Sequence, residues 1–235
     1  GKSDGEVAKL RDEIRSDEEL SYNDTHRQAA EESRKKRLSL SISILKEYIE
    51  SQPVRKFVDG IRKRLDDYSR ELENIYDTVI AAAEEKERVF EFANARRDYE
   101  GLAQQVAYDE VKLKAVYALI ESVDAEVALH AEMVKTINSN APIKLSFDLT
   151  GKLGADALQW SLKRADEGRV TIINRQGIEQ AVKWRDVSGE AFDKLYTLVM
   201  NGSNDKKNLL GLARILHLKG LVERAVELEA LAGRK

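Results

Sequence analysis

A regular seam of apolar residues constrains the fold of this chain more than any other feature of its sequence. Between residues 54 and 80, apolar side chains recur at alternating spacings of four and three residues. That spacing keeps them on one face of an α-helix for about three and a half heptads. The seam comprises Val54, Val58, Ile61, Leu65, Tyr68, Leu72, Ile75 and Val79. A long helix is predicted here, and its seam must pack against this chain or a second molecule.

A second seam of the same period begins at Leu102 and ends at Ile137. It is out of phase with the first, and the mismatch is not the three- or four-residue insertion that a continuous coiled coil absorbs. Asn94 and Gly101 lie between the two seams. We therefore predict a tight reversal near residues 96–102, giving a long antiparallel helical hairpin with arms of about 55–65 Å. One long bent helix is the alternative.

The residues before the first seam predict two shorter helices. The apolar residues of the first are Val7, Leu10 and Ile14, and those of the second are Leu38, Ile42, Leu45 and Ile49. Asn23 or Asp24 is suited to cap the second helix, because short polar side chains accept hydrogen bonds from free helical N–H groups. Ser51 and Pro53 mark its end, and proline is tolerated in the first turn of the helix that follows.

The chain changes character near Pro142, before which acidic residues outnumber basic ones and after which the balance reverses. Residues 143–150 alternate apolar and polar side chains, which is typical of a half-buried strand. Further strands are predicted at residues 158–162, 170–173 and 178–184. The third of the four is apolar on both faces and should be central. Together they predict a small antiparallel meander or a partly closed barrel.

Short helices are predicted after the strands. Ser188 is placed to cap the first of them, and Ser203 or Asn204 to cap the second. Gly220 should end the second helix, because glycine adopts the left-handed conformation common at helix ends. The last helix should reach about Ala232.

The predicted fold class is therefore α+β and mostly α, with the long hairpin followed by a small four-stranded module and short C-terminal helices. A charged content of 34% and only two prolines suit long solvated helices. The predicted domains are residues 1–140, a coiled-coil-like domain; residues 141–188, the β module; and residues 189–235, a helical segment that packs on it.

One stretch of the β module resembles a known family. It contains a strand at 170–173, a glycine turn at Gly177, a strand at 178–184 and a Val-Ser helix start at 187–188. This pattern resembles the small SH3-like homology module of endocytic adaptors and bacterial envelope proteins, over residues 143–195 at most. An aspartate that the family has directly after the serine is displaced here to Asp193. The family carries no catalytic residues, so the resemblance implies a non-catalytic role in a cell envelope.

Residues 208–233 are similar to one tetratricopeptide helix pair. The small and apolar positions of that pattern are occupied by Leu210, Gly211, Gly220, Ala225 and Ala232. Stable arrays of this kind generally need three or more repeats, and one is visible. A plain helical hairpin that caps the sheet is therefore the favoured interpretation.

The sequence contains no recognisable catalytic motif. The absence of cysteine excludes disulfides, thiol catalysis and zinc–thiolate sites. The stretch TGKLG at residues 150–154 lacks the spacing of a phosphate-binding loop and is interpreted as a turn. We predict that the chain is not an enzyme, and we assign no catalytic, cofactor-binding or metal-binding residues.

The three histidines do not form a ligand set. His26 lies in a charged stretch and should be exposed, and His217 lies near a helix end, where a cationic ring suits the helix dipole. His130 occupies a core position of the second seam, four residues after Glu126. A metal site would need ligands from another helix, so a residue that sets the register is the favoured interpretation. Asp109 on the same seam is interpreted as a register or helix-end residue.

Basic residues surround two tryptophans in the β module. They are Lys163, Arg164, Arg169, Arg175, Lys183 and Arg185, beside Trp160 and Trp184. Exposed tryptophans among them would suit a single-stranded nucleic acid or another anionic polymer. Strand alternation turns both tryptophans inward, which favours a solvated basic face instead. The basic run at residues 34–37 follows two glutamates and is interpreted as a charged helix face.

The predicted function is that of a non-catalytic structural or protein-interaction protein, a scaffold or spacer. Its partner should be another protein or a second copy, and binding of nucleic acid or an anionic polymer by the β module is the alternative. The net charge of −3 implies no bulk attraction to anions, and no apolar run is long enough to span a bilayer. We expect the bacterial periplasm or cell surface, with a signal segment trimmed upstream of Gly1, and the cytoplasm as the alternative.

Overall fold

The structure is a computed structural model that describes residues 4–51, 55–150, 160–201 and 205–233. It is mostly helical, with a small antiparallel sheet and short C-terminal helices, which confirms the predicted α+β class. The chain forms two compact units. Unit 1 comprises Gly1–Val79 and Glu100–Val116, and unit 2 comprises Ile80–Tyr99 and Tyr117–Lys235. The predicted domain boundaries after residues 140 and 188 both fall within unit 2.

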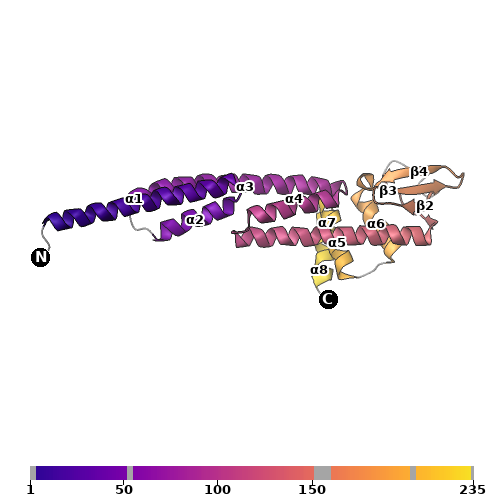
Figure 1. The fold of residues 1–235 in the computed structure, drawn as a ribbon. Helices are drawn as coiled ribbons and strands as arrows, with labels where there is room; N and C mark the ends of the chain where they lie inside the picture. Colours follow the sequence, from indigo (N-terminus) through magenta and orange to yellow (C-terminus); the bar gives the residue numbers. More distant parts are fainter. Residues whose placement is uncertain (1–3, 52–54, 151–159, 202–204, 234–235) are drawn as a thin grey trace. The chain divides into compact units, whose positions relative to one another are not determined.

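Unit 1 begins with helices α1 (Asp4–Arg34) and α2 (Leu38–Ser51), which run side by side (Figure 1). The predicted cap at Asn23 or Asp24 is wrong, because α1 continues through both residues. Asp24 accepts hydrogen bonds from the side chains of Arg27 and Gln28 within the helix, instead of capping free backbone N–H groups. The stretch around it is therefore the middle of a helix.

Two buried serines tie α2 to its neighbours in unit 1. Ser41 Oγ donates to the carbonyl of Ala29 in α1 at 2.9 Å, and Ser39 Oγ donates to the carbonyl of Gln105 at 2.6 Å. Ser39 Oγ also accepts from the N–H of Tyr108 at 3.2 Å. Both hydroxyls are satisfied, so their burial carries no penalty for a lost hydrogen bond.

The first apolar seam lies on α3 (Arg55–Arg88) and packs within the chain. Its buried members are Val58, Ile61, Tyr68 and Leu72. Tyr22 of α1 packs against the start of α3, with its ring 5.3 Å from that of Phe57. A side chain at Gly60 would lie 2.8 Å from the Tyr22 hydroxyl, so glycine makes this close approach possible. Val54 and Pro53 lie outside the described residues.

The predicted reversal at residues 96–102 is wrong, because these residues lie inside helix α4 (Phe92–Gln105). The chain turns instead at residues 89–91, and again at residues 106–109 before α5 (Glu110–Asn140). At the first turn Phe90 adopts a left-handed conformation with φ of 66°. The N–H of Phe90 bonds to Glu87 O and that of Glu91 to Lys86 O, as in a Schellman motif.

The second turn confirms a helix-end role for Asp109, whose Oδ1 accepts from the N–H of Lys112 at 3.1 Å. By contrast, nothing in the sequence around Phe90 indicates that a helix ends there. A bulky residue in the left-handed region is strained by about 1–2 kcal/mol, and glycine usually takes this position. The packing of the phenyl ring must offset that strain.

The sheet belongs to unit 2 and follows the order β1-β2-β3-β4, with every described pair antiparallel. Its strands are β1 (Ile143–Lys144), β2 (Trp160–Ala165), β3 (Arg169–Asn174) and β4 (Glu179–Lys183). The predicted meander and the central place of β3 are therefore confirmed. Leu158, predicted in the second strand, lies outside the described residues.

Two predicted strands are shorter than expected. The first ends at Lys144, because Asp148 Oδ1 accepts from the N–H of Thr150 at 2.9 Å and holds a turn. The fourth begins at Glu179, after an exposed Ile178, and ends before Trp184, which opens a short 3₁₀ turn. Local hydrogen bonds to Asx side chains compete here with strand pairing.

The C-terminal helices are α6 (Gly189–Met200), α7 (Lys206–Leu218) and α8 (Val222–Gly233). Ser188 caps α6 by accepting from the N–H of Ala191, as predicted. The predicted cap of α7 at Ser203 or Asn204 is wrong, because Asp205 accepts from the N–H of Asn208 at 3.1 Å. Gly220 follows α7 with φ of 86°, which confirms its predicted role.

Helix α7 crosses α5 in unit 2 at a point of very close approach. A Cβ at Gly211 would lie 2.6 Å from the carbonyl oxygen of Ala125 and 3.1 Å from the nitrogen of Glu126. Both are backbone atoms, so no side-chain rotation could relieve the clash. The absence of a side chain at Gly211 therefore sets the distance between these helices.

We expect Gly211→Ala to lower the free energy of unfolding by about 1–3 kcal/mol, because α7 would have to move away from α5. Gly101→Ala is the matched control. Its Cβ would meet nothing within 4 Å in the interior of α4, so alanine should raise the free energy of unfolding by about 0.5–1 kcal/mol. Urea denaturation followed by circular dichroism measures both. Equal effects of the two substitutions would contradict the close approach.

Candidate functional site

The structure separates the residues that the sequence singled out. His217 is exposed in the last turn of α7, and His130 is buried on α5, both as predicted. The prediction for His26 is wrong, because its ring is half-buried and packs 4.5 Å from that of Tyr22. Burial, with the nearby charge of Arg64, lowers the pKa of His26. Within the described residues, no group of three or more His, Asp or Glu side chains could hold a metal ion.

A buried ionic cluster lies in unit 2 where α7 meets α3, α4 and α5. We call it the Arg214 cluster, and its members are Glu84, Glu87, Tyr99, Glu126 and Arg214. Arg214 Nε lies 2.9 Å from Glu87 Oε2, and Nη2 lies 3.0 Å from Glu87 Oε1. The same Nη2 bonds to Glu84 Oε1 at 3.2 Å. Tyr99 OH donates to Glu87 Oε1 at 2.5 Å. The buried Glu87 carboxylate is therefore held by a two-pronged guanidinium contact and a phenol.

Glu126 is the unusual member of the cluster. Its side chain is fully buried, and neither carboxyl oxygen has a hydrogen-bond partner among the described residues. Burial raises the pKa of Glu126 well above its ordinary value, and the neighbouring Glu87 carboxylate raises it further. The raised pKa favours the protonated form of the Glu126 carboxyl beside the Glu87 carboxylate. The positive charge of Arg214 lowers the pKa of Glu126, but by less than burial and Glu87 raise it.

A raised carboxyl pKa beside an arginine can mark a catalytic acid. A general acid must reach its substrate, however, and the Glu126 and Glu87 side chains are closed to solvent. A hollow of about 250 Å³ lies next to the cluster, and only Arg214 of the cluster lines it. The arrangement therefore favours a structural role, in which Arg214 fixes α7 against the other helices.

No sequence pattern indicated this cluster. Glu87 and Glu126 resemble ordinary charged residues of helix surfaces, and Arg214 lies more than 80 residues further along the chain. The i, i+4 relation of Glu126 to His130 was visible, but the two side chains have different surroundings. His130 contacts aromatic rings, whereas Glu126 faces Glu87.

The basic residues of the sheet do not form an open stacking platform. Trp184 is fully buried, and its Nε1 donates to the carbonyl of Asp166 at 2.7 Å. Trp160 is half-buried. Lys163 pairs with Glu179, and Arg169 pairs with Asp166 at 3.2 Å. The predicted inward orientation of Trp184 is therefore confirmed, and acidic neighbours offset part of the basic charge.

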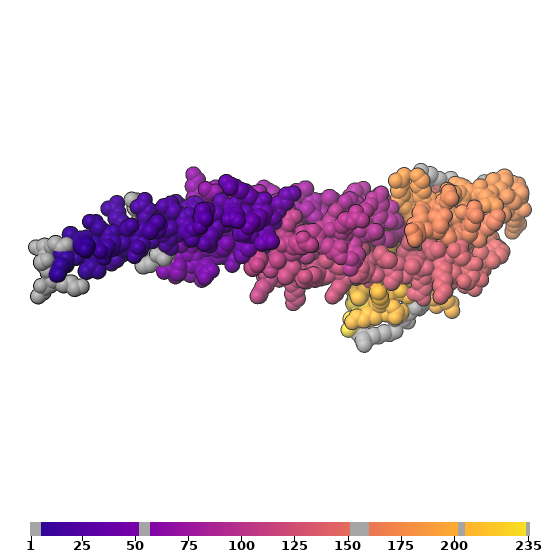
Figure 2. All heavy atoms as spheres, in the orientation of Figure 1, coloured from indigo at the N-terminus to yellow at the C-terminus, as the bar shows by residue number. Residues whose placement is uncertain are grey.

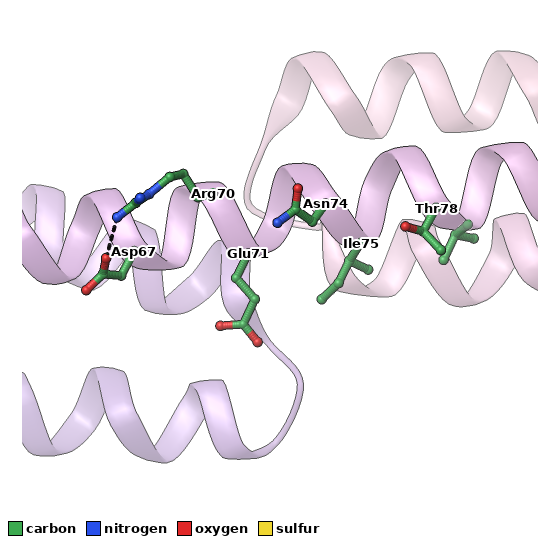
Figure 3. Close-up of a pocket in the computed structure, with 7 residues that line it drawn as sticks. Asp67, Arg70, Glu71, Asn74, Ile75 and Thr78 are labelled. Atoms are coloured by element: carbon green, nitrogen blue, oxygen red, sulfur yellow. Dashed lines mark hydrogen bonds and ion pairs between the residues drawn. The ribbon is translucent and has the colours of Figure 1, made fainter.

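A surface hollow of about 660 Å³ lies along α3 in unit 1 (Figure 3). Figure 3 shows Glu71 and Ile75 pointing to the same side of the helix, while Arg70 pairs with Asp67 at 2.6 Å along the helix surface. All of the residues that line the hollow belong to α3. It is an open surface with one exposed ion pair and has no set of converging polar groups that would hold a ligand.

The first turns of α1 present an apolar stripe to solvent. Val7, Leu10 and Ile14 are exposed by 37%, 40% and 55%. At 100° per residue, Val7 and Ile14 lie within about 60° of Ala29, which contacts the rest of unit 1, and Leu10 lies further around the helix at about 100°. Figure 2 shows the first half of α1 extending past the neighbouring helices of unit 1. The packing face of α1 therefore continues beyond the helices that cover it.

Comparisons of the chain with protein-family models, with curated proteins and with solved structures found no match. Among the described helices, none combines the length and the apolar composition needed to cross a bilayer.

The pKa of Glu126 leads to a prediction on stability. Because folding raises this pKa, the protonated carboxyl stabilises the fold below the pKa of the unfolded carboxyl, about 4.3. That contribution is lost as the pH rises toward the pKa of the folded chain. Glu126→Gln keeps a neutral side chain at every pH. The unsubstituted chain should lose stability from about pH 5 to pH 8, whereas the variant should not. The free energy of unfolding of the variant minus that of the unsubstituted chain should therefore increase over this range, by at most about 1.4 kcal/mol per pH unit.

Urea denaturation at several pH values measures this difference. Glu121→Gln, at an exposed position of α5, is the matched control and should show little change of its relative stability with pH. If the relative stability of Glu126→Gln stayed constant from pH 5 to pH 8, Glu126 would be ionised in the folded chain over that range and the description of the cluster would be wrong.

Proposed function

We propose that this chain is a non-catalytic interaction protein that binds a helix of another protein along the exposed stripe of α1. The main observation behind this proposal is that Val7, Leu10 and Ile14 continue the packing face of α1. No other described residues cover them. Apolar residues at helical spacing on an uncovered face suit helix–helix recognition. A partner helix would extend the packing of unit 1 by several turns.

The acidic residues around the stripe indicate which charge a partner helix should have. Residues 4–20 contain seven acidic and three basic side chains. A second copy of the same helix would bring like charges together, which is unfavourable, whereas a helix with basic flanks would be attracted. We therefore infer a partner that presents an apolar stripe flanked by lysine or arginine.

The remainder of the chain suits the role of a spacer. Four members of the α3 seam are buried within unit 1, and the Arg214 cluster holds α7 within unit 2, so both contribute to packing inside the chain. The resemblance of residues 170–188 to the SH3-like module supports a cell-envelope setting for the same role. The alternative, binding of an anionic polymer by the sheet, has less support because Trp184 is buried and basic side chains there have acidic partners.

A synthetic helical peptide with leucines at i, i+3, i+7 and i+10 and with flanking lysines tests the proposal. We expect it to bind the full chain, with an affinity that falls as salt is added. Leu10→Ser should weaken binding by about tenfold or more, because a leucine contact is lost. Fluorescence anisotropy of a labelled peptide measures both effects.

Leu20→Ser provides the matched control. Leu20 is 65% exposed and lies beyond the end of the stripe, about 110° around α1 from its middle, so its removal should lower peptide affinity far less than Leu10→Ser does. The same peptide with glutamate in place of lysine should bind more weakly. Equal effects of the two leucine substitutions would contradict the stripe. Sedimentation that revealed a dimer which Leu10→Ser dissociates would show instead that the stripe binds a second copy.

A further inference from the structure

A cavity of about 480 Å³ lies in unit 2 beside the α3–α4 turn. Phe90 and the first turn of α4 form one wall, and α5 forms the other. The apolar side chains that line it include Phe90, Phe92, Val127 and Val134. Its volume is within the range of small-molecule sites, and such sites are mostly apolar with a few polar groups that orient the ligand.

His130 is the buried polar group of this cavity. Its side chain lines the cavity, the residue is 6% exposed, and its Nε2 has no hydrogen-bond partner among the described residues. The ring is surrounded by aromatic side chains, with centroid distances of 4.9 Å to Trp184, 5.3 Å to Phe90 and 5.9 Å to Phe92. None of these three rings accepts or donates a strong hydrogen bond to the imidazole. A buried polar atom of this kind calls for an explanation.

The imidazole is uncharged at neutral pH. Burial lowers the pKa of His130 to about 4, although the more distant Asp166 acts to raise it. A neutral imidazole carries one N–H donor and one bare nitrogen acceptor. A hydroxyl group can serve either nitrogen, because it both donates and accepts. A charged group would be less suited, since the lining next to His130 is aromatic.

Phe90 supplies an independent sign that the cavity is a site. Its left-handed backbone places a phenyl ring where helix ends usually have glycine. That ring contacts His130 on one side, and the ammonium of Lys219 lies 5.4 Å from its centroid. Strained residues of this kind cluster at ligand sites. Phe90 is also half-buried, so part of the ring that packs on His130 faces solvent.

We propose that this cavity binds a small, uncharged aromatic molecule that carries one hydroxyl group. The aromatic ring would lie against Phe90 and Phe92, and the hydroxyl would form a hydrogen bond to Nε2 of His130. The exposed Glu91, Lys135 and Glu167 also line the cavity and would contact any polar substituent on the solvent side. This site is independent of the α1 stripe, because none of its lining residues belongs to α1.

Phenol and toluene, which have similar rings and differ in the hydroxyl, provide the probes. We expect phenol to bind the ¹⁵N-labelled full chain saturably at neutral pH and to shift the ring nitrogen signals of His130 and the indole N–H signal of Trp184. Toluene should bind about tenfold more weakly, because it cannot form the hydrogen bond. Equal affinities for the two probes, or unchanged His130 and Trp184 signals at saturation, would overturn the proposal.

Two substitutions separate the cavity from general surface binding. Ala131→Phe should fill the cavity and abolish the phenol-induced shifts, whereas Ala115→Phe, at an exposed position of the same helix outside the cavity, should leave them unchanged. His130→Phe should remove the preference for phenol over toluene while the amide spectrum stays folded. Phenol binding that persists unchanged in Ala131→Phe, or a preference for phenol that persists in His130→Phe, would refute the assignment.

Discussion

Unit 2 depends on the contact between the backbones of α7 and α5 at Gly211. Because α7 lies directly on Ala125, Arg214 one turn later reaches the buried Glu87 carboxylate. Loss of one partner of a buried ion pair costs about 3–5 kcal/mol, since the remaining charge stays unpaired. The position of α7 and the ionisation of the cluster are therefore coupled. A small displacement of the helix would leave the buried charge of Glu87 without its guanidinium.

Unit 1 is held together in a different way. Within its described residues, the buried polar side chains are Ser39 and Ser41, and each hydroxyl bonds to a backbone carbonyl. Its stability comes from the apolar face of α3 and from the contacts of Tyr22, neither of which depends on pH near neutrality. Changes of pH above about 5 should act on unit 2 through Glu126 and the buried His130, and on unit 1 through the half-buried His26.

Periodicity predicted the elements of this fold better than their ends. The α3 seam, the central strand β3 and the Ser188 cap each follow from spacing or from a residue with one strong local preference. The ends of α1 and α3 were missed because both helices close with Schellman motifs that have Lys36 and Phe90 where glycine is usual. The same motif after α7 was predicted, because Gly220 occupies it.

The candidate sites were harder to predict because they depend on residues that are distant in sequence. Nothing near Glu126 indicates that Arg214 will approach it, and the heptad position of His130 does not reveal that Trp184 and Phe90 will surround its ring. Long-range packing determines both environments. The inward orientation of Trp184 was predicted correctly, because Trp184 continues the alternation set by Val182 although it lies just beyond the end of β4.

Some residues of this chain are in surroundings that are unfavourable for their side chains. They differ in whether other residues of the chain offset the cost. Glu126 is a buried acid whose raised pKa favours the neutral form, and Arg214 pairs with the neighbouring Glu87, so the fold itself reduces the cost of the buried charge. The α1 stripe and the Nε2 atom of His130 have no such compensation among the described residues. Sequences that fold well are consistent at every level except where function requires otherwise. On this criterion the Arg214 cluster is structural, whereas the stripe and the aromatic cavity are the places where an outside molecule would complete the packing.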